Sequence, residues 1–173
     1  MGFILDFIRK SVRIEPPTTF VSKPVTIPVP STDLVLDAGD VMGGIFQIRV
    51  PISGVLQGGN VHDRSFVLSG GVRIVVCKAP FTAMEGDAAP SLADVDNLKL
   101  LIDLGFYVWS GYALNYMASL ENVGKRYHIP PEAPGSKMGH FYCQAITTAA
   151  ATIVAGSAPV VSLDIDPDEQ VEG

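Results

Sequence analysis

Charged side chains are scarce in this sequence. Asp, Glu, Lys and Arg together make up 17% of its 173 residues, against about 25% in typical soluble domains. Hydrophobic residues reach 47%, yet no uninterrupted apolar run approaches the ~18 residues that a membrane-spanning helix requires. We therefore expect no membrane partner, and we expect other protein subunits to cover part of the surface.

An excess of basic residues is also lacking. The chain has 12 basic and 18 acidic residues, a formal net charge of −6. Five of the acids fall within residues 163–173, a stretch without any basic residue: Asp164, Asp166, Asp168, Glu169 and Glu172. The rest of the chain is close to neutral, and this charge balance excludes the basic surface on which nucleic-acid binding depends.

Cysteine and histidine are too few, and too widely spaced, to indicate catalysis. Cys77 and Cys143 lie in apolar, strand-like runs, so we expect two buried thiols; one bridge stays open if their strands are neighbours. The three histidines, His62, His128 and His140, show no metal-ligand spacing. A Cys–His nucleophile pair assembled across strands also stays open, although nothing marks either thiol as activated. The sequence predicts no catalytic residue, no cofactor and no metal.

Three further patterns have a functional and a structural interpretation. The glycine clusters lack the Lys-Ser/Thr ending of a phosphate loop, so we interpret them as turns. The alternating acids at 164, 166 and 168 could offer oxygen ligands to Ca²⁺, but Pro167 interrupts them, and a solvated acidic tail is the preferred interpretation. The aromatic residues could stack on a sugar or a base, or pack in the core or an interface, which we prefer. They are Phe106, Tyr107, Trp109, Tyr112 and Tyr116.

What the sequence does contain is strand-like alternation. Phe46, Ile48 and Val50 share one face of a strand while Gln47 and Arg49 occupy the other. Glycine-rich stretches at 51–54 and 57–60 are expected to interrupt the next segment. About eight strands are predicted, at residues 34–36, 44–50, 61–69, 72–78, 99–110, 112–116, 140–148 and 160–165, with a further short one at 127–129. The pattern predicts an all-β, antiparallel β-sandwich or jelly-roll-like domain, with 72–78 as a central strand buried on both faces.

The N-terminal residues differ from the rest. An apolar stripe at helical spacing predicts a short amphipathic helix within residues 3–14. The stripe consists of Phe3, Ile4, Phe7, Ile8 and Val12. A helix of this length is marginal alone in water. It needs a surface, for which we prefer a neighbouring protein to a membrane.

Residues 16–30 are rich in proline. Pro24, Pro28 and Pro30 forbid a helix and a central strand, so this stretch is an extended arm or at most an edge strand. Its two roles, reaching a second subunit or packing along its own domain, both remain open. Phe20, Val25 and Ile27 complete the candidate partner-binding residues. The predicted organisation is an arm at 1–32, a β-sandwich at 33–166 and an acidic tail at 167–173.

An ordered series of short segments extends through the predicted sandwich. The segments are residues 39–45 (GDVMGGI), 76–80 (VCKAP), 88–96 (AAPSLADVD), 98–102 (LKLLI), 141–148 (FYCQAITT) and 160–165 (VVSLDI). In this order, over about residues 33–166, the chain resembles the capsid decoration, or head cement, proteins of tailed bacteriophages. The N-terminal 30 residues are longer than in the simplest members of that family.

The resemblance implies a structural role. It implies a virion protein made in the host cytoplasm, located on the capsid exterior, that binds the major capsid protein and associates with itself as a dimer or trimer. The residues offer no catalytic constellation, so we also expect no enzymatic activity. The alternatives are a carbohydrate- or receptor-binding β-sandwich of the virion, with Tyr107, Trp109 and Tyr112 facing the ligand, and another structural position in the head or tail.

Overall fold

The chain folds as an all-β protein, as the sequence predicts. A computed structural model describes residues 18–29, 34–63, 71–84, 92–93, 95–107, 109–112, 115–153 and 159–169. Within these ranges it contains thirteen strands and one short 3₁₀ helix, η1 (Asn97–Lys99). The predicted amphipathic helix and its residues Phe3, Ile4, Phe7, Ile8 and Val12 lie outside the described residues.

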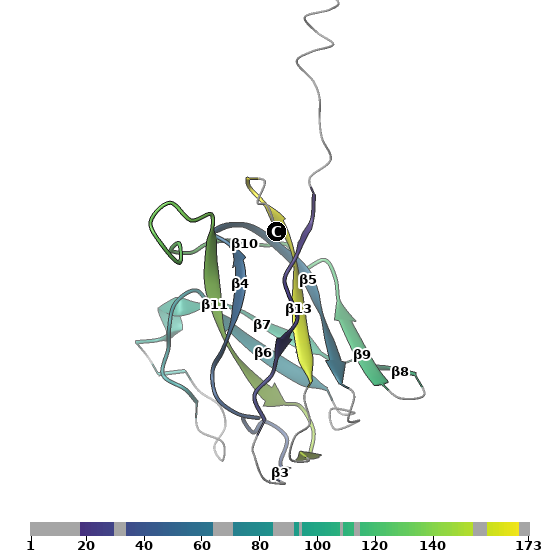
Figure 1. The fold of residues 1–173 in the computed structure, drawn as a ribbon. Coiled ribbons are helices and arrows are strands. Elements are labelled where there is room, and N and C mark those ends of the chain that lie inside the picture. The colour runs from purple at the N-terminus through teal and green to yellow at the C-terminus, as the bar shows by residue number, and fades with distance from the viewer. Residues whose placement is uncertain are drawn as a thin grey trace, which may run out of the picture.

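The larger sheet is antiparallel and has seven strands (Figure 1). They are β1 (Phe20–Val21), β2 (Val25–Thr26), β5 (Ser53–Asp63), β8 (Trp109–Tyr112), β9 (Asn115–Leu120), β10 (Lys125–His128) and β13 (Val160–Pro167). The main order is β1-β13-β5-β9-β8, with β2 also paired to β13 and β10 also paired to β5. Strands from both ends of the chain therefore lie side by side in this sheet.

The smaller sheet has four strands in the order β4-β11-β6-β7. They are β4 (Phe46–Pro51), β6 (Val72–Cys77), β7 (Leu100–Phe106) and β11 (Met138–Thr147). A separate two-stranded ladder joins β3 (Leu34–Leu36) to β12 (Ala151–Ile153). The prediction for β6 is confirmed, because it lies between two strands and its residues are buried except at Arg73, which is half-buried.

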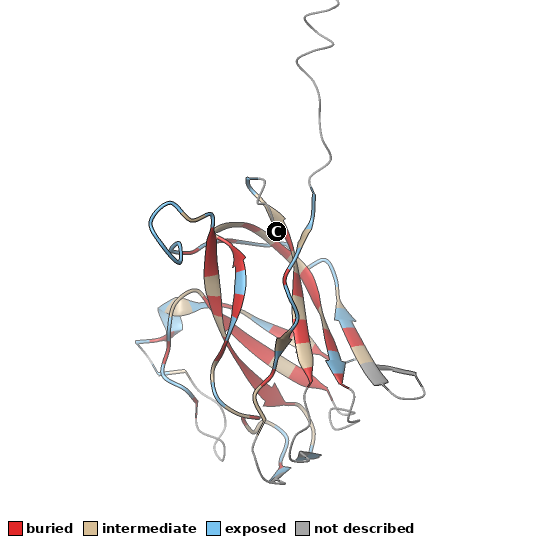
Figure 2. Cartoon of the chain, viewed as in Figure 1, coloured by how far each residue is buried: buried red, intermediate tan, exposed pale blue. Residues whose placement is uncertain are grey.

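One hydrophobic core fills the space between the two large sheets. Ile48, Val76 and Phe141 of the smaller sheet belong to the same buried cluster as Leu56 and Leu163 of the larger one. Figure 2 shows the corresponding buried bands along the facing strands. On β4, Phe46, Ile48 and Val50 are buried while Gln47 and Arg49 are exposed, which confirms the predicted alternation.

A second cluster covers the outer face of the smaller sheet. Val75, Cys77 and Ile146 from the strands pack there against Phe81 and Met84 of the following loop. Gln144 fixes this loop, since its side-chain oxygen accepts a hydrogen bond from the Met84 amide at 2.9 Å. The smaller sheet is therefore buried on both faces over part of its area.

The expectation that glycines interrupt residues 51–60 is wrong. The chain passes from one sheet to the other at Ile52 and then forms β5, a single strand of eleven residues. Its glycines permit close approach of neighbouring strands: a Cβ on Gly59 would lie 2.6 Å from the Ser162 carbonyl oxygen, and one on Gly58 would clash with the carbonyl of Leu120. Glycine here is required by packing between strands rather than by a turn.

Two other boundaries also differ from the prediction. Residues 112–116 do not form one strand, because Tyr112 pairs with Asn115 across the hairpin between β8 and β9. The sequence pattern at residues 91–94 also predicts a single helical turn that ends at Asn97. In the structure the helical residues are instead Asn97–Lys99, which form η1. The cause of the second shift is Asp96, whose backbone oxygen accepts a hydrogen bond from the Lys99 amide at 2.9 Å.

Candidate docking groove

A mostly apolar groove lies between the N-terminal strand segments and the outer face of the smaller sheet. Its volume is about 370 Å³. The lining residues come from β1, β2 and the Lys23 between them, and from β4 and β11: Phe20, Val21, Lys23, Val25, Gln47, Arg49, Met138 and His140. An apolar groove with a few polar side chains around it is a typical site for a protein or peptide ligand.

Two of the predicted partner-binding residues line this groove. Phe20 and Val25 are half-buried and pack against the main core. Ile27 does not line it: its side chain is 1% exposed and belongs to the core of its own domain. Ile27 is therefore a packing residue of the sandwich in this structure.

The N-terminal segment is attached firmly where it forms the groove. Phe20 pairs with Ile165 and Val25 with Val161, both on β13. Between them, the Ser22 amide donates to the Leu163 carbonyl and the Ser22 hydroxyl oxygen accepts from the Leu163 amide, both at 2.9 Å. The sequence leaves two roles open for residues 16–30, reaching a second subunit or packing along their own domain. In the structure, residues 20–27 pack along their own domain as an edge strand.

Proline limits what the outer edge of this segment can do. Pro24 and Pro28 have no N–H group, and each interrupts the row of donors that a further strand would need. The unpaired edge is therefore protected against extended strand addition. A ligand of the groove would contact side chains rather than extend the sheet.

An ion pair forms the polar end of the groove. The Arg49 guanidinium donates to Glu132 through Nη2 at 2.6 Å and through Nε at 2.9 Å, in a two-pronged arrangement. His140 Nε2 lies 3.9 Å from the same carboxylate. The hydrogen bonds from Arg49 hold the pKa of Glu132 at about 2, well below its usual value of 4.5. The Arg49–Glu132 pair links β4 to the loop that precedes β11.

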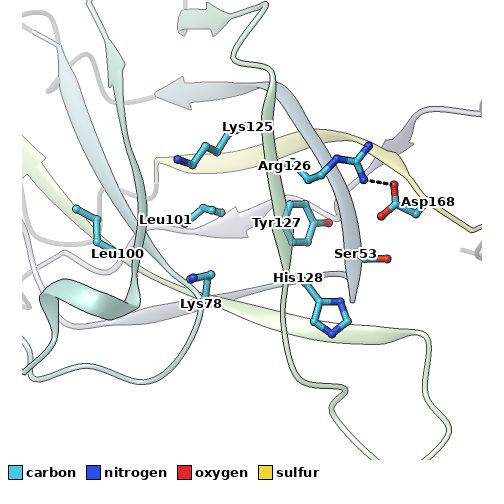
Figure 3. A pocket seen from close by; sticks show the side chains of 9 residues that line it. All are labelled: Ser53, Lys78, Leu100, Leu101, Lys125, Arg126, Tyr127, His128 and Asp168. Atoms are coloured by element: carbon cyan, nitrogen blue, oxygen red, sulfur yellow. Dashed lines mark hydrogen bonds and ion pairs between the residues drawn. The ribbon is translucent and has the colours of Figure 1, made fainter.

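A second concave region opens beside β10 (Figure 3). We call it the basic pocket; its volume is about 600 Å³. It is lined by Ser53, Lys78, Leu100, Leu101, Lys125, Arg126, Tyr127, His128 and Asp168. Arg126 Nη1 donates to Asp168 Oδ1 at 2.7 Å, so the predicted acidic tail begins on its rim. The tail is thus partly paired rather than simply solvated.

Two of the three aspartates considered for Ca²⁺ have other partners. Asp166 accepts hydrogen bonds from Gln57 Nε2 at 2.6 Å and from the Thr19 hydroxyl at 3.0 Å. Asp168 is paired with Arg126. Within the described part of the chain, no group of three or more His, Cys, Asp or Glu side chains is placed to hold a metal ion.

The two cysteines are buried free thiols, which confirms the first of the two predicted states. Their strands are neighbours, but Cys143 packs in the main core and Cys77 in the outer cluster. Burial raises the pKa of Cys77 to about 11 and raises that of Cys143 as well. Neither thiol is an activated nucleophile.

The predicted aromatic group is divided. Phe106 is 1% exposed and belongs to the core, whereas Tyr107 is 60% exposed. The Tyr107 ring lies so close to Gly105 that a Cβ there would collide with it. The side chains of Trp109, Tyr112 and Tyr116 lie outside the described part of the chain.

Sequence reasoning missed most of the groove and all of the basic pocket. The outward direction of Arg49 follows from alternation along β4, but its proximity to Phe20 depends on pairing between the first and last strands. The basic residues of the pocket come from β10 and from Lys78, which directly follows β6. These two parts of the pocket are separated by about a third of the sandwich sequence. No local pattern predicts such a meeting.

Comparison with known proteins adds no family to these observations. No protein-family model matches the sequence, and no curated protein matches it. In the described residues, no helix has the length and apolar character needed to cross a membrane.

Proposed function

We propose that this protein is a structural subunit of a tailed-bacteriophage head. It binds the outer surface of the shell formed by the major capsid protein and bridges neighbouring shell subunits. The resemblance over residues 33–166 supports this role, and the β-sandwich fold is consistent with it. The cellular site of synthesis is the host cytoplasm, and the site of action is the exterior of the virion.

The observation that carries the proposal is the position of the N-terminal segment. β1 and β2 form one wall of the groove, and the chain preceding Thr18 carries the apolar stripe Phe3, Ile4, Phe7, Ile8 and Val12. The apolar N-terminal segment, which we expect to need a partner surface, therefore joins the sandwich beside an apolar groove. An amphipathic helix filling a groove on a neighbouring protein is a common recognition mode.

The many equivalent binding sites on a shell explain why weak individual contacts suffice for attachment. A shell presents many equivalent sites, and a subunit that contacts two shell proteins, or a second copy of itself, gains effective concentration for each further contact. The low proportion of charged residues suits a protein whose surface is partly covered by neighbours. Self-association as a dimer or trimer belongs to the same proposal.

A second candidate is a carbohydrate- or receptor-binding module of the virion. Tyr107 favours it, because an exposed aromatic ring lying across a glycine offers a flat face for a sugar. A glycan array separates the candidates, since a shell-binding subunit should give no glycan signal. Another position in the head or tail would be recognised by binding to assembled tails or portals instead of shells.

Sedimentation with empty shells tests the first candidate. The probe is shells assembled from the major capsid protein of the same virus, mixed with the purified full chain. We expect the chain to sediment with the shells up to a saturating number of copies. A chain that remains in the supernatant at every concentration would contradict the proposal.

The N-terminal contribution is tested by deleting residues 1–17 rather than 1–30. Removal through residue 30 would expose the edge of β13 and leave the site of Ile27 empty. The shorter deletion leaves the described sandwich intact, so a loss of sedimentation with unchanged thermal unfolding would assign attachment to the N-terminal segment. Full occupancy by the shortened chain would show that the segment is dispensable.

A further inference from the structure

The segment from Val95 to Leu100 reverses the usual distribution of polar and apolar side chains. Val95 is 75% exposed and Leu98 is 89% exposed, whereas Asp96 between them is only 1% exposed. Leu100 follows at 39% exposure. We call Val95, Leu98 and Leu100 the apolar knob. Single exposed apolar residues need no explanation, but three of them around a buried carboxylate do.

Hydrogen bonds to Asp96 hold this reversed arrangement. Its Oδ2 accepts from the Thr82 amide at 2.8 Å, and its Oδ1 accepts from Lys99 Nζ at 2.6 Å. Lys99 Nζ also donates to the Pro80 carbonyl at 2.7 Å. These bonds hold the pKa of Asp96 below its usual value, so the carboxylate stays charged at neutral pH.

The backbone of the same segment is also fixed. The Asp96 amide donates to the Ala93 carbonyl at 2.7 Å, and the Lys78 amide donates to the Lys99 carbonyl at 2.8 Å. Moving Leu98 inward would break the Asp96–Lys99 pair and leave a buried carboxylate without its partner, which is strongly unfavourable. These contacts therefore hold the apolar knob exposed to solvent.

The apolar knob continues into the basic pocket. Leu100 belongs to both, and in Figure 3 the side chains of Leu100, Leu101, Lys78 and Lys125 lie on the same side of the β10 ribbon. Arg126 and His128 lie on its other side, where Arg126 meets Asp168. The two lysines beside the leucines form no ion pair with any residue that the structure describes.

Lys78 and Lys125, which pair with none of the described residues, lie next to exposed and buried leucines and define the chemistry of a partner. The pocket is lined by Lys78, Lys125 and Arg126 and by a single acid, Asp168, so the site is locally positive. A complementary surface would place an apolar side chain against Leu98 and Val95, and carboxylates near Lys78 and Lys125. Charge complementarity of this kind selects the partner and its orientation.

We propose that the apolar knob and the basic pocket form one docking surface for an acidic segment of the capsid shell. That segment carries a large apolar side chain flanked by Asp or Glu. This inference rests on the proposed function and adds to it a second attachment surface, distinct from the groove. A subunit with two separate contacts can bridge two shell proteins.

Matched pairs of exposed residues test this surface. Val95→Asp and Lys125→Glu change the proposed surface, while Val35→Asp and Lys137→Glu are the controls. Val35 is 72% exposed on β3, and Lys137 lies outside both sites, 3.3 Å from Glu169. All four side chains are exposed, so all four variants should fold, and thermal unfolding checks this.

The measurement is sedimentation with the empty shells at two salt concentrations. We expect Val95→Asp and Lys125→Glu each to weaken the apparent affinity by about tenfold or more, as for central interface residues, with the controls unchanged. Raising NaCl from about 0.1 to about 1 M should weaken the wild type more than Lys125→Glu, because the Debye length falls from ~10 to ~3 Å.

Each outcome supports or overturns the inference. If wild type binds shells and all four variants bind equally, the docking surface is wrong while the proposed function stands. If wild type fails to bind shells at all, both fall. If sedimentation velocity without shells shows that wild type self-associates and Val95→Asp does not, the occupant is a second copy and the shell assignment is wrong.

Discussion

The rings of Tyr127 and Phe141 meet edge to face, with centroids 4.7 Å apart and planes inclined at 67°. This contact joins β10 of the larger sheet to β11 of the smaller one across the core. Tyr127 also donates from its hydroxyl to the Pro51 carbonyl at 3.0 Å, at the point where the chain passes between the sheets. The two residues thus link the sheets beside the basic pocket.

The first prediction concerns the size of this link. Phe141 is fully buried, so Phe141→Ala should lower the free energy of unfolding by about 3–5 kcal/mol. Tyr127→Phe keeps the ring and removes only the hydrogen bond, for a loss of about 0.5–1.5 kcal/mol. Urea unfolding followed by circular dichroism measures both; equal losses would show that the ring contact contributes little.

The second prediction concerns the glycines of β5. Gly58→Ala should destabilise by about 1–3 kcal/mol, because the new Cβ collides with the backbone of Leu120. Gly44→Ala is the matched control: nothing lies within 4 Å of the position its Cβ would take. We expect the control to stay within about 0.5 kcal/mol of wild type. Equal stability of the two variants would contradict the close approach of β5 and β9.

The third prediction concerns pH. The hydrogen bonds from Arg49 depress the pKa of Glu132 from 4.5 to about 2. A depressed carboxyl pKa stabilises the folded state above the unfolded value, and this contribution disappears as pH falls through the folded value. Glu132→Gln should therefore have a lower urea midpoint than wild type at pH 7, and the gap should narrow between pH 4.5 and pH 2.

Glu169→Gln serves as the control for that experiment. Glu169 is exposed and lies 3.3 Å from Lys137, and exposed pairs of this kind contribute little. Its urea midpoint should follow wild type throughout. A gap for Glu132→Gln that stays constant down to pH 2 would mean that the ion pair is not its source.

The fourth prediction concerns the thiols. Cys77 and Cys143 are buried, and burial raises both pKa values. At pH 8 a disulfide reagent such as Ellman's should therefore react slowly with the native protein, and two thiols per chain should react once urea unfolds it. Rapid reaction of one thiol in the native state would reopen the possibility of a Cys–His nucleophile.

The fold class could be predicted from the sequence because local alternation determines it. On β4 and β6 the side-chain pattern alone gives the strand, its faces and its depth in the core. The sequence predicts too few strands, because β1, β2 and β12 have two or three residues each and carry too little periodicity to be recognised. β5 was divided because its glycines resemble a turn signal, while their role depends on the strands beside them.

The surfaces were harder to predict than the core. The sequence predicts Phe20 and Val25 as partner-binding residues of an arm, yet their position beside His140 follows only from pairing with the last strand. Val95 and Leu98 gave no signal at all. In the sequence they read as ordinary apolar residues, and their exposure follows from the burial of Asp96 by contacts with Thr82 and Lys99.

Electron cryomicroscopy of the assembled particle tests the central claim most directly. We expect density for the β-sandwich on the outside of the head, with the N-terminal segment in contact with the major capsid protein and Leu98 facing an acidic part of the shell. Density for this chain only inside the head or on the tail, or its absence from purified particles, would contradict the account.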